Sequence, residues 1–322
     1  MSVLVVVEHD RGVMAPASSE ALTAGRQLVA GSGSLEALTI GADADGLAGE
    51  LGRFGVATVH QAHHDLLSDY SPEAWGAVVA QTAEELAPSA VLAAGTDRGH
   101  EVLAHAAARL DLPMIANCTA ITPGEPWTVT RVRWGGSLLE EAKLEASVAL
   151  LTTALHAFDA EGVGATGAPD THELTPDLGP ELACTTIQER VERAAGITLA
   201  TAPVVVGGGR GVGSADAFAA LEELAGLLGG VVGCSRVVTN NGWRNHSDQV
   251  GQTGTRIAPT VYLACGISGA IQHWVGAMAA KNIIAVNLDP EANMVTKAGY
   301  AVIGDLHEVV PAISAEIRRR RG

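Results

Sequence analysis

Apolar and polar positions alternate along the first half of the chain as short apolar runs separated by amphipathic stretches. The apolar runs predict strands at Val3–Val7, Leu35–Ile40, Thr58–Gln61 and Ala90–Ala94. Apolar residues at helical spacing predict helices at Ser19–Val29, opened by a serine cap, at Pro72–Leu86 and at His100–Leu110. Strands that alternate with helices in this way indicate a doubly wound, mainly parallel sheet.

The pattern changes after Trp127. Thr128–Trp134 is rich in β-branched and aromatic residues, a glycine pair follows, and Ser147–Leu155 has the composition of another strand. We expect these two strands to form an antiparallel appendage on the first domain. Gly162–Pro180 is rich in Gly, Pro, Thr and Asp without apolar periodicity, which predicts an exposed loop. Order is expected to return at Thr185–Ala195, so we predict two domains, 1–196 and 197–322.

In the second half, predicted strands again alternate with helices, and the elements are shorter. Its predicted strands are Val204–Val206, Val231–Cys234, Thr260–Ala264, Ile283–Val286 and Tyr300–Ile303. Its predicted helices are Ser214–Leu228, Ala270–Ala280 and a final helix from Leu306. Short, continuously apolar strands are typical of sheets buried on both faces. The fold class predicted for the chain is therefore α/β with two doubly wound domains, the second of them Rossmann-like.

Composition and charge narrow the choice of partners. The chain has 322 residues, of which 47% are hydrophobic, enough for two cores, and its net charge of −16 disfavours nucleic acids and anionic membranes. No apolar run approaches the ~20 residues of a membrane-spanning helix, and the start of the chain lacks the features of a signal peptide. The four cysteines (Cys118, Cys184, Cys234 and Cys265) form no C-x-x-C pair and are expected to be small buried residues of a reducing compartment. We expect a cytoplasmic protein.

Polar side chains follow each predicted strand of the second half, namely Arg210, Ser235 with Arg236, Ser268, Asn287 and Asp305. Because ligands of open α/β sheets bind outside the carboxyl ends of the strands, these residues predict a cofactor crevice. The glycine-rich run 207–213 matches neither G-x-G-x-x-G nor the P-loop pattern, but it provides backbone donors beside Arg210 that suit a phosphate. A second glycine-containing turn, 266–273, reads Gly-Ile-Ser-Gly-Ala-Ile-Gln-His and places a histidine where it could tune a bound cofactor.

Six motifs occur in order in the second half: Gly-Gly-Arg-Gly (208–211), Cys-Ser-Arg (234–236), Val-Gly-Gln-Thr-Gly (250–254), the run 266–273, Val-Asn-Leu-Asp-Pro (286–290) and Gly-Asp-Leu (304–306). Together they closely resemble the electron transfer flavoprotein alpha subunit. The first domain resembles the same family more loosely, through Val-Val-Val-Glu-His (5–9), Ala-Asn-Cys-Thr (116–119) and Arg-Val-Arg-Trp-Gly-Gly (131–136).

The resemblance implies that the second domain binds FAD at an interface with a different, beta subunit, which would itself hold AMP. Arg210 is similar to the cofactor-facing arginine of the first glycine turn, and Arg236 of the Ser235–Arg236 pair to an arginine that lies against the isoalloxazine ring. The loop of Val250, Gly251, Gln252 and Thr253 resembles one that hydrogen-bonds the flavin, with the threonine near N5. The implied contacts to the ribityl chain and the pyrimidine end are Ser268, Gly269, Ala270, Ile271, Gln272 and His273. Those to the adenosine end are Asn287, Asp305 and Leu306.

The resemblance also implies an electron carrier without substrate turnover or catalytic residues of its own. It would accept electrons from flavoprotein dehydrogenases of the acyl-CoA type, as in fatty-acid β-oxidation, and pass them to a membrane quinone reductase. Arg236 and His273 would stabilise the anionic semiquinone, because preorganised donors near N1–C2=O favour negative charge there. Asn240 and Thr255 depart from the aspartate and lysine usual in the family, which bears on potential and partner choice.

Other interpretations remain open. The alternative within the family is a subunit that serves electron bifurcation or nitrogen fixation. Outside it stand a nicotinamide-dependent deacylase, a middle domain of a thiamine enzyme and a nucleotide-sensing module, although the paired C-x-x-C zinc motifs of such a deacylase are missing. His60, His63 and His64 with Asp65 mimic a metal cluster but are expected to lie in a loop, so no metal site is predicted.

Overall fold

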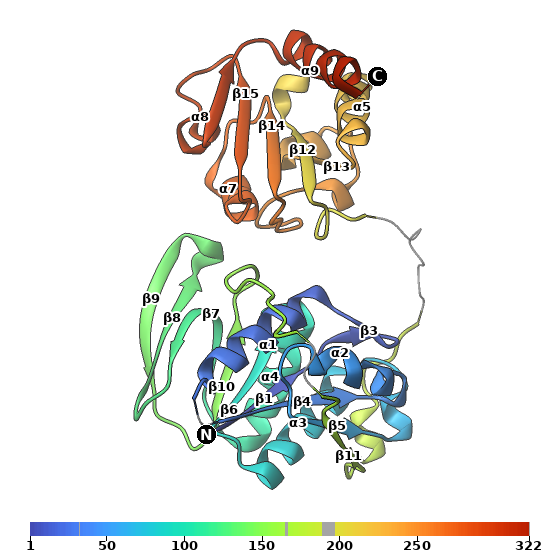
Figure 1. The fold of residues 1–322 in the computed structure, drawn as a ribbon, viewed down its shortest axis with the longest axis vertical. Helices are drawn as coiled ribbons and strands as arrows, with labels where there is room; N and C mark the ends of the chain where they lie inside the picture. Colours follow the sequence, from blue (N-terminus) through green and yellow to red (C-terminus); the bar gives the residue numbers. More distant parts are fainter. Residues whose placement is uncertain (32, 165–166, 189–196, 322) are drawn as a thin grey trace. The chain divides into compact units, whose positions relative to one another are not determined.

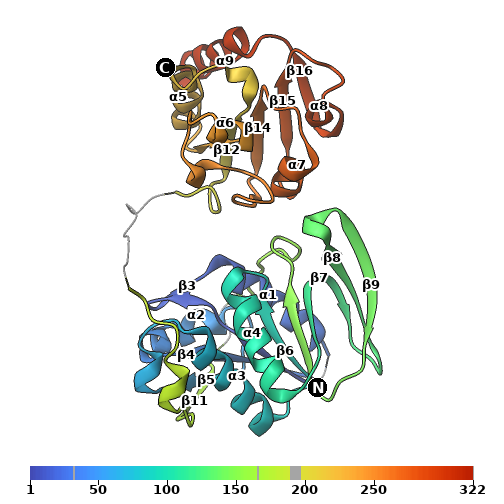
Figure 2. The same ribbon diagram turned by 180° about the vertical axis from the view of Figure 1, so that it is seen from behind.

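The structure is a computed structural model that describes residues 1–31, 33–164, 167–188 and 197–321. The chain divides into two compact units, one of Met1–Trp134 with Leu138–Glu192 and one of Arg193–Gly322 with Gly135–Ser137. Figures 1 and 2 show, from opposite sides, that each unit has a central sheet with helices on its faces, which confirms the predicted α/β class. The predicted domain division between residues 196 and 197 borders undescribed residues and stays a prediction. Most of the predicted segment Thr185–Ala195 also lies outside the described residues, and 185–188 form neither helix nor strand.

The first unit is built on a nine-stranded sheet in the order β11-β5-β4-β1-β6-β10-β7-β8-β9. Neighbours are parallel from β11 to β7, whereas β8 is antiparallel to both β7 and β9. The strands are β1 (Ser2–Val6), β4 (Ser34–Ile40), β5 (Thr58–Ala62), β6 (Ala90–Ala94), β7 (Met114–Thr122), β8 (Trp127–Arg133), β9 (Leu138–Leu144), β10 (Ala149–Thr153) and β11 (Asp170–Leu174). A small antiparallel hairpin of β2 (His9–Asp10) and β3 (Val13–Met14) follows β1.

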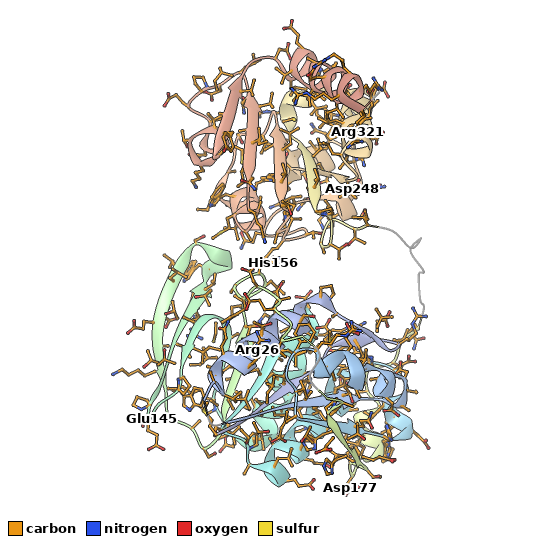
Figure 3. The ribbon with its side chains drawn as sticks, viewed as in Figure 1. Arg26, Glu145, His156, Asp177, Asp248 and Arg321 are labelled. Carbon is orange, nitrogen blue, oxygen red and sulfur yellow. The ribbon has the colours of Figure 1, made fainter. Side chains whose placement is uncertain are left out.

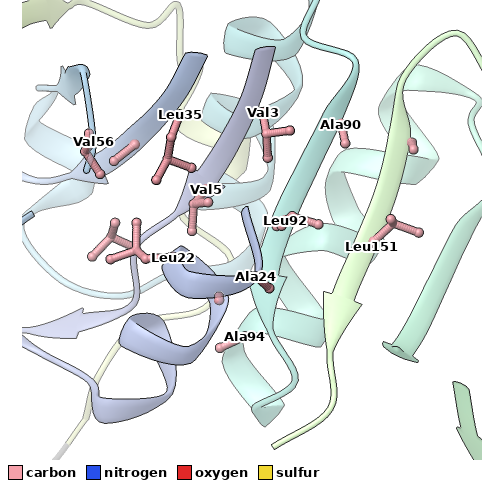
Figure 4. Packing of buried hydrophobic residues seen from close by; sticks show 14 of the residues in the cluster. Val3, Val5, Leu22, Ala24, Leu35, Val56, Ala90, Leu92, Ala94 and Leu151 are labelled. Atoms are coloured by element: carbon pink, nitrogen blue, oxygen red, sulfur yellow. The ribbon is translucent and has the colours of Figure 1, made fainter. Parts of the chain in front are cut away.

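Helices cover both faces of this sheet because successive residues of its central strands point in opposite directions. Val3 and Val5 of β1 belong to the apolar core shared with α1 (Pro16–Leu28) and α2 (Ala48–Gly52), part of which Figure 4 shows. Leu4 and Val6 belong to the core on the other face, shared with α3 (Pro72–Leu86) and α4 (Asp97–Leu110). Burial on both faces is typical of strands with continuous apolar runs, such as β1.

Several details of the first unit differ from the prediction. The strand predicted at Ser147–Leu155 is not part of an antiparallel appendage: β10 lies inside the sheet, parallel to β6 and β7. The antiparallel partners of β8 are β7 and β9, neither of which was predicted. The region predicted as the loop Gly162–Pro180 contains β11. The serine cap of the first helix is also wrong, because the helix begins at Pro16, a residue suited to the first turn, with Ala15 in the N-cap position.

The second unit has a five-stranded, fully parallel sheet in the order β13-β12-β14-β15-β16. Its strands are β12 (Val204–Gly208), β13 (Val231–Cys234), β14 (Val261–Cys265), β15 (Ile283–Asn287) and β16 (Tyr300–Ile303). One face packs against α5 (Ala219–Leu227), α6 (Arg236–Asn240) and α9 (Leu306–Arg321), and the other against α7 (Ile271–Ala277) and α8 (Asn293–Lys297). The unit is therefore doubly wound, as predicted.

The second unit also corrects three expectations. The helix predicted at Ser214–Leu228 begins as a 3-10 turn, Asp216–Phe218, and only then becomes α5. The helix predicted at Ala270–Ala280 is the shorter α7. All four residues of β16, which is an edge strand, are exposed, so burial on both faces does not hold there.

An ion pair fixes the segment after α6. The Arg244 Nε donates to Asp248 at 3.0 Å, and the guanidinium lies 5.5 Å from the centre of the Phe218 ring, which belongs to the core (Figure 3 labels Asp248). A further contact joins Arg244 to Glu222 of α5. This segment leads directly into the loop at residues 249–255 discussed below.

Two findings bear on the expected environment. All four cysteines are free; Cys118, Cys234 and Cys265 are buried as predicted, but Cys184 is exposed. Within the described ranges, no helix combines the length and apolar character needed to cross a membrane.

Candidate functional site

The strand order of the second unit defines where a ligand fits. β12 is the first strand in the chain, and its two neighbours are β13 on one side and β14 on the other. The connections from β12 and β14 therefore leave toward opposite faces of the sheet, and a crevice opens between the carboxyl ends of these two strands. Both glycine-containing turns predicted to bind a cofactor begin at those ends.

The backbones of the two turns lie against each other. The Gly209 N–H donates to the Cys265 carbonyl at 2.9 Å, and the Gly211 N–H donates to the Gly266 carbonyl at 3.1 Å. A Cβ atom on Gly266 would lie 2.8 Å from the Gly211 Cα, and Gly266 has a φ of +63°. Glycine is required at this position both for the close approach and for the left-handed backbone. The pair of turns forms the floor of the crevice.

A cavity of about 520 Å³ occupies this crevice, and nine of the predicted cofactor-binding residues line it. They are Arg210, Ser235, Arg236, Ser268, Gly269, Ala270, Gln272, His273 and Asn287. A larger cavity of about 780 Å³ in the first unit includes Met1, Ser89 and Ser147, at the amino ends of β1, β6 and β10. We regard the smaller one as the candidate site, because it lies where an open parallel sheet binds its ligands.

Two polar atoms in the wall of this cavity have no hydrogen-bond partner among the described residues, the Ser235 Oγ and the His273 Nδ1. Ser235 occupies the N-cap position of α6, where a serine hydroxyl normally accepts from the helix backbone, yet its side chain caps nothing. Leaving a buried polar atom unsatisfied costs about 1–3 kcal/mol. Two such atoms in one cavity fit a site whose ligand supplies their partners.

His273 is held as a neutral imidazole. Its Nε2 lies 2.7 Å from the hydroxyl of Tyr262, which is fully buried in β14. Burial lowers the pKa of His273 to about 4, and a weaker interaction with the Val250 backbone opposes the shift. At neutral pH the ring therefore contributes hydrogen-bond donation to the cavity and no positive charge.

Positive charge comes from two arginines instead. Arg210 and Arg236 line the cavity with exposed side chains, and among the described residues neither guanidinium takes part in an ion pair or hydrogen bond. In a chain with a net charge of −16, two unpaired arginines at one crevice favour an anionic ligand. Guanidinium groups bind phosphate oxygens through paired hydrogen bonds.

The loop Val250–Thr253 lies next to the cavity without lining it. The Gln252 N–H donates to the Gln272 carbonyl at 2.8 Å, which ties the loop to the start of α7. The Thr253 hydroxyl accepts from the amide of the buried Gln249 at 2.9 Å, and the same amide accepts from Thr239 of α6 at 2.8 Å. Gln252 and Thr253 are exposed, whereas Val250 and Gly251 are buried.

The predicted residues at the adenosine end have different environments. The Asn287 amide donates to the Ile267 carbonyl at 3.0 Å and accepts from the Asp289 N–H at 3.1 Å, so it braces the turn after β14. Asp305 accepts from the His307 N–H at 2.9 Å, and Leu306 packs in the core. Neither Asp305 nor Leu306 lines the cavity, and the same is true of the exposed Ile271. For these three residues a direct ligand contact stays a prediction.

Six residues of the cavity wall are absent from the prediction. They are Gly211, Val237, Gly266, Ile267, Asp289 and Ala292. Gly211, Gly266, Ile267 and Asp289 lie within motifs already singled out, so the motif boundaries were a usable signal for them. Val237 and Ala292 offer no chemical signal, because they line the wall as small or apolar residues next to functional ones.

Two histidines of the run His60, His63 and His64 in the first unit form hydrogen bonds with carboxylates. His60 is not in a loop but in β5, where its Nε2 bonds the Glu36 carboxylate at 2.7 Å. His63 bridges Asp45 at 2.9 Å and Glu173 at 3.0 Å. Among the residues that the structure describes, no group of three or more His, Cys, Asp or Glu side chains is arranged so that it could hold a metal ion.

The fold and the cavity together define an α/β protein with a cavity suited to an anionic ligand at the switch point of its second sheet. Comparison with known families makes this specific. The profile described as "Electron transfer flavoprotein domain" matches residues 3–178, and "Electron transfer flavoprotein FAD-binding domain" matches residues 198–278. The second match contains both glycine turns of the crevice.

Similar proteins cover nearly the whole chain. An electron transfer flavoprotein subunit alpha from Mycobacterium tuberculosis is 35% identical over 322 residues, which is 99% of each chain. One from Thermoanaerobacterium thermosaccharolyticum is 32% identical over 98% of this chain and 97% of its own. A probable mitochondrial one from Caenorhabditis elegans is 34% identical over 98% of this chain and 93% of its own. This chain belongs to the electron transfer flavoprotein alpha-subunit family.

Proposed function

We propose that the chain is the alpha subunit of a heterodimeric electron transfer flavoprotein that binds FAD in the cavity between β12 and β14. It receives electrons from flavoprotein dehydrogenases of the acyl-CoA type and passes them to a quinone reductase. Its partner is a beta subunit, which holds AMP. The observation that carries the proposal is the pair of unsatisfied buried atoms in the cavity wall, Ser235 Oγ and His273 Nδ1, both of which belong to the segment 198–278 that matches the FAD-binding family.

The residues of the cavity fit the parts of FAD. The guanidinium of Arg210 suits the pyrophosphate, which is anionic and rich in acceptors, whereas the Gly209 and Gly211 N–H groups already donate to the second glycine turn. The unpaired Arg236 and the neutral donor His273 suit a ring system that gains negative charge when it is reduced. Flavin supplies the redox chemistry when it is bound, and the chain's residues bind it, orient it and set the local charge.

We place the protein in the cytoplasm as a carrier without substrate turnover. Free cysteines at all four positions suit a reducing compartment. The carrier role follows from the family and from the proposed work of the cavity residues, which is to hold the cofactor and stabilise its charge.

Substituting the charged and donor residues separately tests this function. We expect Arg236→Ala and His273→Ala to keep FAD, as judged by the visible spectrum of the protein purified with its beta subunit. Both should reduce the yield of the one-electron-reduced anionic flavin during reductive titration, because each removes a group that stabilises negative charge. A loss of about 1 kcal/mol per group lowers the equilibrium constant for forming two one-electron-reduced flavins from one oxidised and one fully reduced flavin by roughly thirtyfold, because that state enters the equilibrium twice.

Lys281→Ala is the matched control. Lys281 is exposed, and its substitution removes one positive charge from the same unit, as Arg236→Ala does. It lies just before β15, at the amino end of the sheet, opposite the cavity. Its titration should follow the wild type. A colourless heterodimer, or equal yields in the wild type and both cavity variants, would contradict the proposed function.

A further inference from the structure

A buried hydrogen-bonded pair joins the sheet of the second unit to the helix that carries His273. Tyr262 lies in β14 with none of its surface exposed, and its hydroxyl lies 2.7 Å from the His273 Nε2. The phenol covers Gly207 of β12: a Cβ atom there would lie 2.4 Å from the Tyr262 hydroxyl. A glycine in the middle of a buried strand weakens the strand, so its presence under this ring indicates that the sheet makes room for the phenol.

The direction of this hydrogen bond follows from the donors and acceptors that Tyr262 and His273 have to satisfy. A neutral imidazole has one N–H donor and one bare nitrogen acceptor, and a phenol has one O–H donor. Burial raises the pKa of Tyr262 well above its usual value and lowers that of His273, so both groups are neutral. If the phenol donates to Nε2, the donor of Tyr262 and the acceptor of His273 are both satisfied.

The opposite direction leaves more polar groups unsatisfied. If the His273 Nε2–H donated to the phenol oxygen, the Tyr262 O–H would need another acceptor, and His273 is its one hydrogen-bond partner among the described residues. The bare Nδ1 would also be left without a donor, because it has no partner in the described part of the chain. A buried donor without a partner costs about 1–3 kcal/mol, which favours the first direction.

We propose that Tyr262 is a positioning residue: by donating to the His273 Nε2 it fixes the imidazole in the tautomer that carries its proton on Nδ1. His273 lines the cavity, and apart from a weaker interaction of the ring with the Val250 backbone its Nδ1 has no hydrogen-bond partner among the described residues, so the Nδ1–H can donate to a bound ligand. The ligand group that it selects is a hydrogen-bond acceptor, such as a carbonyl oxygen or a ring nitrogen that becomes negative on reduction. The selection of this ligand group rests on the proposed FAD site, whereas the assignment of the His273 tautomer does not.

Tyr262 therefore acts on the cofactor through His273 without touching it. In Tyr262→Phe the ring of residue 262 still fills the space over Gly207, but Nε2 loses its donor. The two tautomers then become closer in energy, and a fraction of the molecules presents a bare Nδ1 to the ligand. A bare nitrogen repels a carbonyl oxygen, so flavin affinity should fall by about threefold to tenfold.

Nitrogen-15 NMR of histidine-labelled full-length chain, with its beta subunit, tests the tautomer directly. Long-range proton–nitrogen spectra distinguish a protonated from a bare ring nitrogen, and a His273→Gln variant identifies the signals of this residue among the 11 histidines. We expect a protonated Nδ1 and a bare Nε2 in the wild type at pH 6–8, with and without flavin. Tyr262→Phe should show a mixture, and Tyr300→Phe, which removes the hydroxyl of an exposed tyrosine in β16, should match the wild type.

The outcomes separate this proposal from the proposed function. A wild-type His273 with its proton on Nε2 overturns the role of Tyr262, and so does a Tyr262→Phe spectrum identical to the wild type. If Tyr262→Phe does not fold, the wild-type spectrum alone decides. A protonated Nδ1 in a protein that binds no flavin would support Tyr262 as the positioning residue and refute the FAD site. Bound flavin together with a bare Nδ1 would support the FAD site and refute the role of Tyr262.

Discussion

At the scale of single residues, the chain buries two serine hydroxyls that have no partner among the described residues. Ser235 lies in the cavity wall at the start of α6, and Ser314 lies in the middle of α9. Both are buried, but Ser314 does not line the cavity. Comparing the two serines therefore separates the effect of an unsatisfied buried hydroxyl on stability from its effect on ligand binding.

We expect Ser235→Ala and Ser314→Ala to change the stability of the flavin-free protein by less than about 1 kcal/mol, because neither mutation breaks a hydrogen bond. Only Ser235→Ala should weaken FAD binding, by about threefold to tenfold, since one neutral hydrogen bond contributes about 0.5–1.5 kcal/mol. Denaturant unfolding and fluorescence titration with FAD measure the two quantities. An equal loss of affinity in both variants would show that the hydroxyl of Ser235 is not a ligand contact.

The sequence predicts the polar wall of the cavity better than the rest of it. Arg210, Ser235, Ser268 and Asn287 were found because each follows a parallel strand, and carboxyl ends of such strands share one edge. Asp305 follows a strand too, but β16 is the edge strand and the carboxylate is used by the backbone of α9. Strand order depends on long-range pairing, which a local pattern does not reveal.

At the scale of elements, β11 shows how pairing overrides local pattern. All but one of its residues are exposed, so it lacks the apolar alternation that signals a strand. Its backbone pairs in parallel with β5, and its side chains add two contacts: Glu173 bonds His63 at 3.0 Å, and the rings of His172 and His60 stack 5.9 Å apart. The strand therefore exists because of a neighbour that is more than a hundred residues away.

This arrangement predicts a dependence of β11 on pH. Hydrogen bonds to Asp45 and Glu173 raise the pKa of His63 above its usual 6.5. A raised pKa in the folded state means that the contribution to stability is complete below the unfolded-state pKa and is lost as pH rises through the folded-state pKa. The side chains are partly exposed, so the contribution is at most about 1 kcal/mol.

Hydrogen exchange of the β11 amides, followed from pH 6 to pH 8.5 and corrected for the intrinsic exchange rate, measures this effect. Protection should decrease as pH rises in the wild type and should vary less in His63→Gln. His307→Gln, which replaces an exposed histidine of α9, is the control and should behave like the wild type. Protection that increases with pH would have the wrong sign and would rule out the ion pair as the cause.

At the scale of the whole molecule, the two units have separate cores. The apolar clusters of the first unit contain residues up to Leu182, and those of the second begin at Leu199. Both units share the doubly wound plan, but the unpaired arginines and the unsatisfied Ser235 and His273 belong to the second. FAD should therefore stabilise the second unit and leave the first unchanged.

Scanning calorimetry of the full chain tests this division. Without FAD we expect unfolding in two steps, because separate cores need not unfold together. Free FAD at a hundredfold excess over its Kd should stabilise one step by about 2.7 kcal/mol, the value that mass action gives for a ligand bound only by the folded state. Ser235→Ala should reduce the shift at a fixed FAD concentration, and Ser314→Ala should not. If both steps moved together with FAD, the units would be one cooperative body, and the cofactor would depend on residues of the first unit as well.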